Sequence, residues 1–212
     1  MKDFSSLSIQ AFLEVLGSSS PAPGGGSVAA ICASLASRLT EMVANLTIGR
    51  DKFASGQEAM SQAREIAKSL SDDFMNLAKK DTEAFNLFMK TMSLPKETDE
   101  ERRIRKDAMQ WALKESTLVP LEILSLTRDL SANSLSAAIH GNPNAVTDVG
   151  VSALLAEAAA KGAAMNARVN LSSIHDSEFA EKCFKEMEFH LAETSRNVFE
   201  VLSIVDSKLN GS

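Results

Sequence analysis

The sequence predicts an all-helical fold, a bundle of about five to six mostly long antiparallel helices. Apolar residues recur at intervals of three and four almost throughout the 212 residues, and sustained strand-like alternation is hard to find. Glycine and proline between the periodic segments divide the chain into a few long pieces. No repeat, low-complexity tract or long linker interrupts the pattern, so residues 1–212 are expected to form a single domain.

Each predicted helix has its own start or stop signal. The expected helices cover, in order, residues 6–16, 25–48, 55–92, 98–130, 143–170 and 176 to near the C-terminus. Thr98 and Glu101 form a capping box, and Pro120 is expected to kink the fourth helix. Asn142 is a plausible cap for the fifth, with Pro143 at its first position. Only residues 168–174 resemble a short strand.

The second predicted helix carries two kinds of apolar surface. Its stripe of large side chains consists of Val28, Ile31, Leu35, Leu39, Met42 and Leu46. Alanine and serine fill much of the remainder, and the fifth helix is equally rich in alanine and glycine. Because small side chains let helix axes approach to about 8 Å, these helices need close neighbours, either inside one chain or in another subunit. We expect part of this surface to form a homodimer.

Composition excludes several classes of function. Apolar residues make up 44% and charged residues 24%, and no apolar run reaches the roughly 18 residues of a membrane span, so a soluble, cytoplasmic protein without a secretion signal is expected. The formal charge of -6 gives no general attraction for nucleic acid. Cys32 and Cys183 lack CxxC spacing and are expected to be buried thiols. Because tyrosine is absent, proton transfer must use carboxylates, histidine, lysine or water.

The segment PAPGGGS places Gly24, Gly25, Gly26 and Ser27 at the entrance of a helix. It lacks the Gly-Lys-Ser/Thr ending of a Walker loop and the strand that precedes a dinucleotide-binding loop. Free N–H groups and bare backbone at a helix start suit contact with a ligand, and close packing is the alternative. Ser27 is a candidate cap or ligand contact, and a role as nucleophile is disfavoured because no histidine partner is identifiable.

The segment GNPNAVTD, residues 141–148, is a second polar helix entrance. Asp148 lies in an otherwise apolar helix, where an unpaired carboxylate is costly to bury, so a partner or a function is expected. Asp148, Ser152, Asn166 and Asn170 share one side of this helix. Since Asp148 and Asn166 are roughly 27 Å apart along the axis, they would serve opposite ends of a long ligand or two different sites.

Other polar residues admit both structural and functional interpretations. Asp81 borders the apolar face of the third helix as a boundary residue or a base. Glu186, His190 and Glu193 have workable metal spacing, but the surrounding charges indicate a solvated face, and no metal is predicted. Basic residues near helix ends complement the helix dipole or pair with a carboxylate ligand; they are Arg50, Lys52 and Arg168.

Taken together, the segments SPAPGGGSVAAICASLASRLTEMVANLTIGR, DTEAFNLFMKTMSLPKETDEE, ALKESTLVPLEIL and GNPNAVTDVGVSALLAEAAAKGAAMNARVNL resemble the cyclodeaminase/cyclohydrolase family. This family includes the C-terminal domain of formiminotransferase-cyclodeaminase and free-standing bacterial relatives. The resemblance covers nearly the whole chain in the same order. It implies an all-helical dimer that binds tetrahydrofolate derivatives near the subunit interface.

The resemblance also implies a function and its residues. Family members close 5-formimino-tetrahydrofolate to 5,10-methenyl-tetrahydrofolate with loss of ammonia, or hydrolyse the methenyl ring to 10-formyl-tetrahydrofolate. The corresponding polar residues here are Asp81, Asn142, Asp148, Asn166 and Asn170, beside the glycine loop Gly24–Ser27. Asp148 or Asp81 is expected to be the general acid/base, with no prosthetic group and with Arg50, Lys52 or Arg168 receiving the glutamate carboxylates. A non-catalytic folate-binding or structural helical dimer is the alternative.

Overall fold

The bundle is organised around the small side chains of its second helix. The computed structural model describes residues 6–211, and all regular structure within that range is helical. The helices are α1 (Ile9–Leu16), α2 (Gly25–Asn45), α3 (Gln57–Met92), α4 (Asp99–His140), α5 (Val146–Leu171) and α6 (Ser177–Asn210), with short 3-10 turns η2 (Asp51–Gly56) and η3 (Pro143–Ala145). The predicted all-α fold of long helices is therefore confirmed.

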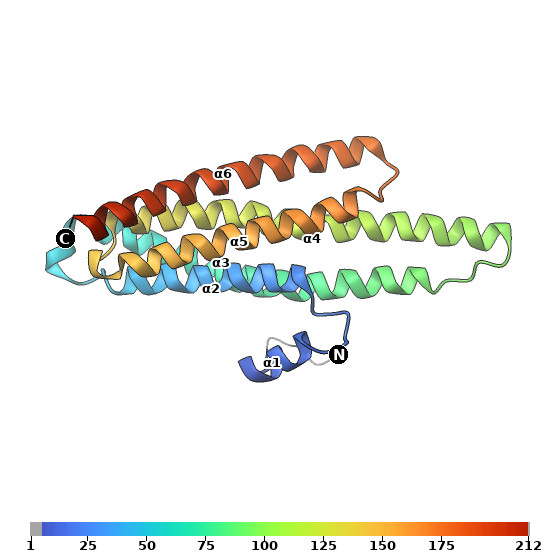
Figure 1. Cartoon of the computed structure of the whole chain (residues 1–212), viewed down its shortest axis with the longest axis horizontal. Coiled ribbons are helices and arrows are strands. Elements are labelled where there is room, and N and C mark those ends of the chain that lie inside the picture. The colour runs from blue at the N-terminus through green and yellow to red at the C-terminus, as the bar shows by residue number, and fades with distance from the viewer. Residues whose placement is uncertain (1–5, 212) are drawn as a thin grey trace.

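Helices α2 to α5 form the elongated body of the molecule, in which α2 packs on α3, α3 on α4, α4 on α5 and α5 on α2. Helix α6 covers α4 and α5, as Figure 1 shows. The short α1 fully buries none of its residues, and it contacts the bundle through Phe12, which packs against the core. The far ends of α3 and α4 project beyond the loop that joins α5 to α6 (Figure 1).

The buried face of α2 consists mainly of small side chains and not of the predicted stripe of large apolar ones. Ala30, Ala33 and Ala36 are fully buried inside the chain, whereas Leu35 is 55% and Met42 37% exposed. The other members of the predicted stripe are partly buried, and Ile31 and Leu46 pack against the core. A Cβ placed on Gly162 of α5 would lie 3.3 Å from the Cβ of Ala29, so small side chains allow α2 and α5 to pack closely. The small-residue surface is thus used within one chain, and Leu35 and Met42 are the large apolar side chains of the stripe that face outward.

The boundaries differ from the predicted ones where buried side chains continue a helix. Helix α4 does not end near residue 130 but runs through Pro120 to His140, because Ala137 and Ala138 are still in the core. The capping box of Thr98 and Glu101 is present. The segment 168–174, the one stretch that resembles a strand in sequence, is the last turn of α5 and the turn after it, and the predicted end of this helix near residue 170 is confirmed.

Helix α2 is also long and apolar enough to cross a membrane by length and composition. More than half of that segment, 56%, is buried inside the bundle. Since α2 packs against α3 and α5 along its length, its apolarity is explained by its place in the core.

Candidate active site

Asp81 on α3 lies against the first turn of α2. The hydroxyl of Ser27 donates a 2.8 Å hydrogen bond to Oδ2 of Asp81 and lies 3.1 Å from Oγ1 of Thr82. Ser27 and Thr82 are buried, and the Asp81 side chain lies between them and a cavity that it helps to line. Ser27 therefore orients the carboxylate and does not act as a helix cap, since no side chain caps α2.

Gly26 makes this arrangement possible. A Cβ built on Gly26 would collide with Oδ1 of Asp81 and lie within 2.8 Å of Oδ2. Only a residue without a side chain lets the α2 backbone approach the carboxylate this closely. The neighbouring Gly25 is less restricted, because its nearest neighbour would be Nδ2 of Asn166 at 3.9 Å. The second and third glycines of the segment thus lie next to two predicted site residues.

The cavity beside Asp81 has a volume of about 300 Å³ and lies between α3, α4 and α5. Phe85, Phe88 and Leu113 give it apolar walls, and Asn166 and Asn170 add amides. A flat apolar wall with a few polar groups suits an aromatic or heterocyclic ligand. The chain thus assembles a carboxylate, two amides and two phenyl rings around one space.

Each asparagine is anchored through one N–H. Asn166 Nδ2 donates to the carbonyl oxygen of Gly162 at 2.9 Å, and Asn170 Nδ2 donates to that of Ser116 at 3.1 Å. Because Pro120 has no N–H, the Ser116 carbonyl lacks its helical donor, and Asn170 replaces it. Each amide keeps a carbonyl oxygen and a second N–H for contact with a ligand.

Burial raises the pKa of Asp81 above its ordinary value, and hydrogen bonds from Ser27 lower it to a smaller extent. Burial disfavours the charged carboxylate, which makes Asp81 a stronger proton acceptor than a solvated aspartate. A carboxyl group whose pKa is moved toward neutrality can both accept and return a proton. Asp81 therefore has the properties of a general acid/base.

The structure places other predicted site residues at the opposite end of the bundle. Asn142 is buried, and its Oδ1 accepts from the Asn144 N–H while its Nδ2 donates to the Leu46 carbonyl. Arg50 and Lys52 lie at the connection between α2 and α3, where the Lys52 Nζ is 5.6 Å from the Phe53 ring centre. Within one chain these residues do not reach the Asp81 cavity.

Asp148 lies in the first turn of α5 at this same end and is half-buried. Partial exposure and the positive end of the helix dipole explain how α5 tolerates its charge. Asp148 and Asn166 are roughly 27 Å apart along the axis. Asp148 and Asp81 of the same chain therefore do not lie in one site.

Arg168 is close to the cavity in sequence but points elsewhere. Its Nη2 lies 2.7 Å from Oε1 of Glu188 on α6, in an ion pair that is about half exposed. Arg168 thus joins α5 to α6, and an anionic ligand would have to compete with Glu188.

Thr82, Phe85, Phe88 and Ser116 belong to the surroundings of Asp81, although sequence reasoning did not select them as site residues. The one available signal was the apolar stripe of α3 that contains both phenylalanines. It does not distinguish a core face from a cavity wall, because both need apolar side chains at helical spacing.

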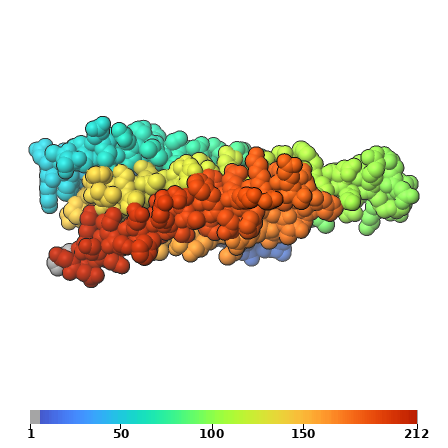
Figure 2. Space-filling model, turned by 90° about the horizontal axis from the view of Figure 1, so that it is seen from above, coloured from blue at the N-terminus to red at the C-terminus, as the bar shows by residue number. Residues whose placement is uncertain are grey.

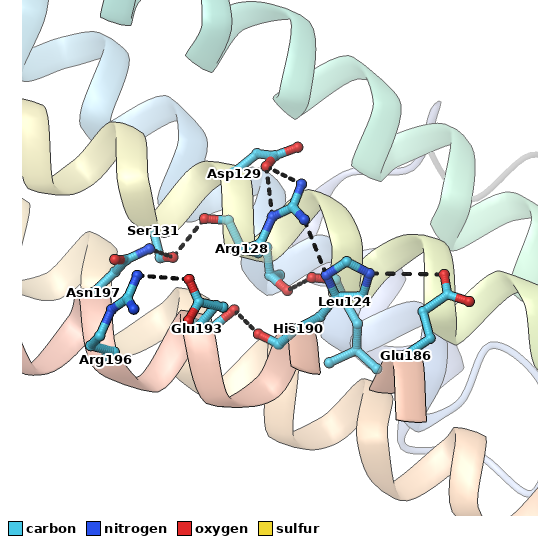
Figure 3. A network of polar contacts seen from close by, with 11 residues as sticks. Leu124, Arg128, Asp129, Ser131, Glu186, His190, Glu193, Arg196 and Asn197 are labelled. Carbon is cyan, nitrogen blue, oxygen red and sulfur yellow. Dashed lines mark hydrogen bonds and ion pairs between the residues drawn. The ribbon is translucent and has the colours of Figure 1, made fainter. Parts of the chain in front are cut away.

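A larger hollow of about 580 Å³ lies between α3 and α4, but its lining is mostly small side chains. Its carboxylate, Asp129, is bound to Arg128, which also approaches His190 (Figure 3). His190 is buried, so this part of α6 is not the solvated face that its charges indicated. Burial, followed by the Arg128 charge, lowers the pKa of His190. This network joins α4 to α6.

The nearby spacing of Glu186, His190 and Glu193 does not form a ligand set in the structure. Glu193 pairs with Arg196, and Nε2 of His190 is 3.8 Å from Glu186 (Figure 3). Within residues 6–211 no group of three or more His, Cys, Asp or Glu side chains could hold a metal ion.

The fold and the site together define a helical bundle with a carboxylate, amides and aromatic rings around a small-molecule cavity. Residues 8–189 match the family model described as formiminotransferase-cyclodeaminase. The chain therefore belongs to the formiminotransferase-cyclodeaminase family, which confirms the resemblance found in the sequence.

Two relatives and one solved structure agree with this assignment. The chain is 38% identical to a methenyltetrahydrofolate cyclohydrolase from Methylorubrum extorquens, over 95% of this chain and 97% of that protein. It is 33% identical to the formimidoyltransferase-cyclodeaminase of Gallus gallus, over 93% of this chain but only 37% of that longer protein. The crystal structure of a formiminotetrahydrofolate cyclodeaminase from Thermotoga maritima superimposes with a TM-score of 0.87 at 28% identity, covering 97% of this chain and 98% of that one.

Proposed function

We propose that this protein is an enzyme of folate one-carbon chemistry that acts on the carbon bridging N5 and N10 of tetrahydrofolate. The observation that carries the proposal is the Asp81 carboxylate, held by Ser27 and with a raised pKa, beside an aromatic-walled cavity. The relatives named as a cyclohydrolase and a cyclodeaminase support it. A tetrahydrofolate derivative is the substrate, and no prosthetic group is part of the proposal.

Both candidate reactions exchange a nucleophile at one carbon. In cyclisation of the protonated formimino group, N10 forms the new bond to carbon and loses a proton, while the nitrogen of the departing amine gains one and leaves as ammonia. In hydrolysis, water adds to the cationic methenyl carbon and loses one proton. The oxygen then loses its second proton as the formyl C=O forms, while the bond from carbon to N5 breaks and N5 gains a proton. Asp81 would transfer these protons, and Asn166 and Asn170 would orient the ligand through their remaining polar atoms.

The exposed members of the α2 stripe, Leu35 and Met42, are proposed to form a homodimer with the exposed side chains of α5. Leu154 is 51%, Met165 65% and Val169 69% exposed on α5, which packs against α2. Large exposed apolar side chains on two adjacent helices are typical of an interaction site. A second copy of this chain is the proposed occupant because it also explains the separated site residues.

In a two-fold dimer, the same surface meets itself. If the two-fold axis passes through the middle of the stripe, near Leu35 and Leu154, the two copies lie side by side and antiparallel. The Asp148 end of one copy is then beside the Asp81 end of the other. Asp148 of the partner subunit would then lie near Asn166 and Asp81 of this chain. This arrangement would unite both predicted carboxylates in one site at the subunit interface.

Mixing two inactive variants tests the shared site. Asp81→Asn and Asp148→Asn homodimers are each expected to be inactive, but subunit exchange restores one complete site in each mixed dimer. Since half of the dimers are mixed and one of their two sites is complete, about a quarter of wild-type activity should return. Activity that does not return would contradict the dimer, and full activity of both single variants would contradict the acid/base assignments.

The reaction itself is tested with both substrates, by following formation of the methenyl chromophore with ammonia release and its loss by hydrolysis. One of the two rates should exceed the uncatalysed rate. If neither does while folate still binds, the non-catalytic folate-binding dimer replaces the enzyme. A cytoplasmic location, a single domain and no nucleic-acid or membrane partner remain predictions.

A further inference from the structure

Thr82 uses its hydroxyl differently from the other buried threonines of the chain. It follows Asp81 on α3 and is 6% exposed, and its Oγ1 lies 3.1 Å from Oγ of Ser27 on α2. Among residues 6–211, the other buried threonines each donate to a backbone carbonyl three or four residues earlier; they are Thr40, Thr47, Thr91, Thr117, Thr127 and Thr194. That local bond is a common partner for a threonine hydroxyl in a helix. The Thr82 hydroxyl is directed at a neighbouring helix instead.

The contact between Ser27 and Thr82 is enclosed in the bundle. Ser27 is 0% exposed, and α3 to α6 form the face seen in Figure 2, with α2 beneath them. Thr82 is not among the described residues that line the Asp81 cavity, so a ligand there does not touch it. An influence of Thr82 on the reaction therefore has to pass through Ser27.

The hydrogen bonds of Ser27 have one consistent direction while Asp81 is ionised. An ionised carboxylate can only accept, so the single hydroxyl proton of Ser27 is donated to Oδ2 of Asp81 at 2.8 Å. The Ser27 oxygen then meets Thr82 as an acceptor, and Thr82 is the donor. The two hydroxyls thus form a chain of donors that ends on the carboxylate. A bond donated to Ser27 polarises its hydroxyl and strengthens the bond that it donates in turn.

Hydroxyl groups rather than charged side chains surround the Asp81 carboxylate. Asp81 is the one titratable group among the described residues that line its cavity, and α2 carries no charged residue before Arg38. Charged side chains of α3, α4 and α5 in this region form partly exposed ion pairs, which are Lys80–Glu122, Lys114–Asp176 and Arg168–Glu188, or are exposed, as are Lys79, Glu83 and Glu115. Burial and the bonds from Ser27 are accordingly the causes that move the pKa of Asp81. A change in the hydroxyl chain should therefore be measurable at this carboxyl group.

We propose that Thr82 is a positioning residue for the reaction, whose hydroxyl donates to Ser27 and commits the Ser27 proton to the Asp81 carboxylate. The inference rests on the proposed function, which assigns the proton transfer to Asp81. The donor chain holds the carboxylate in one orientation beside the cavity and favours its ionised form, which a general base needs before it accepts a proton. Asp81 transfers the proton, and its neighbour Thr82 acts on it through α2.

Carbon-13 NMR titration of the Asp81 carboxyl, assigned by the loss of its signal in Asp81→Asn, tests the donor chain without requiring turnover. Thr82→Val lacks the donor, so the bond from Ser27 to Asp81 should weaken by about a fifth and the midpoint of the titration should move up by about 0.3 pH. Thr82→Ser retains a hydroxyl and should titrate like the wild type. Thr127→Val removes a buried hydroxyl that donates to the Leu124 carbonyl on α4, and it should leave the midpoint unchanged.

Combining Thr82→Val with Ser27→Ala separates an effect through Ser27 from any other effect. Once position 27 is alanine, Thr82→Val should cause no further movement of the midpoint, because the bond on which it acts is absent. In the pH–rate profile, Thr82→Val should move the acidic limb of kcat/KM in the same direction as the titration. It should change KM by no more than about twofold, since Thr82 lies behind Ser27 and outside the cavity lining.

Thr82→Ala is a second variant without the donor and should give the same movement as Thr82→Val. A midpoint that stays at the wild-type pH in both variants would overturn the inference. A further movement in the Ser27→Ala background, or an equal movement caused by Thr127→Val, would do the same. Failure of the proposed function has a separate sign, the absence of turnover by the wild-type protein with either one-carbon substrate, and it does not alter the NMR result.

Discussion

Gly26→Ala tests whether the position of the Asp81 carboxylate matters for activity. The new Cβ would overlap Oδ1 of Asp81 and crowd its other carboxylate atoms, so the side chain must rotate away from Ser27. A displacement on the order of 1 Å at a reacting group can cost about 100-fold in rate. We expect kcat/KM to fall by about that factor.

The effect on stability should be smaller than the effect on activity. Losing a hydrogen bond to a charged group costs about 1.5–3 kcal/mol, and a strained rotamer about 0.5–1.5 kcal/mol. Replacing a helical glycine by alanine returns about 0.5–1 kcal/mol. The net loss of about 1–4 kcal/mol is measurable by urea unfolding and should leave a folded protein for the assay.

Gly25→Ala is the matched control, because its Cβ would meet only Asn166 Nδ2 at an ordinary 3.9 Å. It should change kcat/KM by no more than about twofold. In an Asp81→Asn background, Gly26→Ala should cost no further activity, since both changes act on the same carboxylate. A folded Gly26→Ala variant with wild-type kcat/KM would refute this reasoning.

Three further outcomes follow from single interactions. Ser27→Ala removes a bond that lowers the Asp81 pKa, so the acidic limb of the pH–rate profile should move to higher pH, whereas Ser34→Ala should not move it. In a double-mutant cycle measured by urea unfolding, Asn170→Ala should lower the free energy of unfolding by about 1 kcal/mol less in a Pro120→Ala background than in the wild type. The reason is that alanine at position 120 restores the helical N–H donor to the Ser116 carbonyl, and additive losses would contradict that role of Asn170. Because the pKa of His190 is lowered in the folded protein, protonation favours the unfolded chain, and the free energy of unfolding should decrease as the pH falls below about 6.5. Urea unfolding of a His190→Gln variant should show a weaker decrease.

The sequence predicted the fold well because the helical periodicity, the capping box and the Asn142–Pro143 start are local signals. The end of α4 was wrong because Pro120 normally weakens a helix, and no local signal indicates that Asn170, fifty residues later, replaces the missing donor. A long-range hydrogen bond of this kind exists only in the folded chain.

The candidate site was predicted in part, and the reason lies in helix lengths. The motif residues come from both ends of α5, and the sequence does not state which end meets Asp81. The packing of α2 against α3 and α5 decided this, because it places Ser27 against Asp81 and Gly25 near Asn166. Residue type alone also could not distinguish Arg168, bound to Glu188, from Arg102, Arg105 and Lys106, which line a hollow next to the Asp81 cavity.

The composition of α2 connects the site with the proposed dimer. Its alanines are buried against the neighbouring helices and Gly26 admits the Asp81 carboxylate, so α2 uses its small side for the core and the site. Leu35 and Met42 are left on the outside, where a lone chain would expose them to water without gain. A second copy that covers this stripe removes the exposed surface and brings Asp148 of the partner subunit toward the Asp81 cavity. The same helix would then determine both where the carboxylate lies and where the subunits meet.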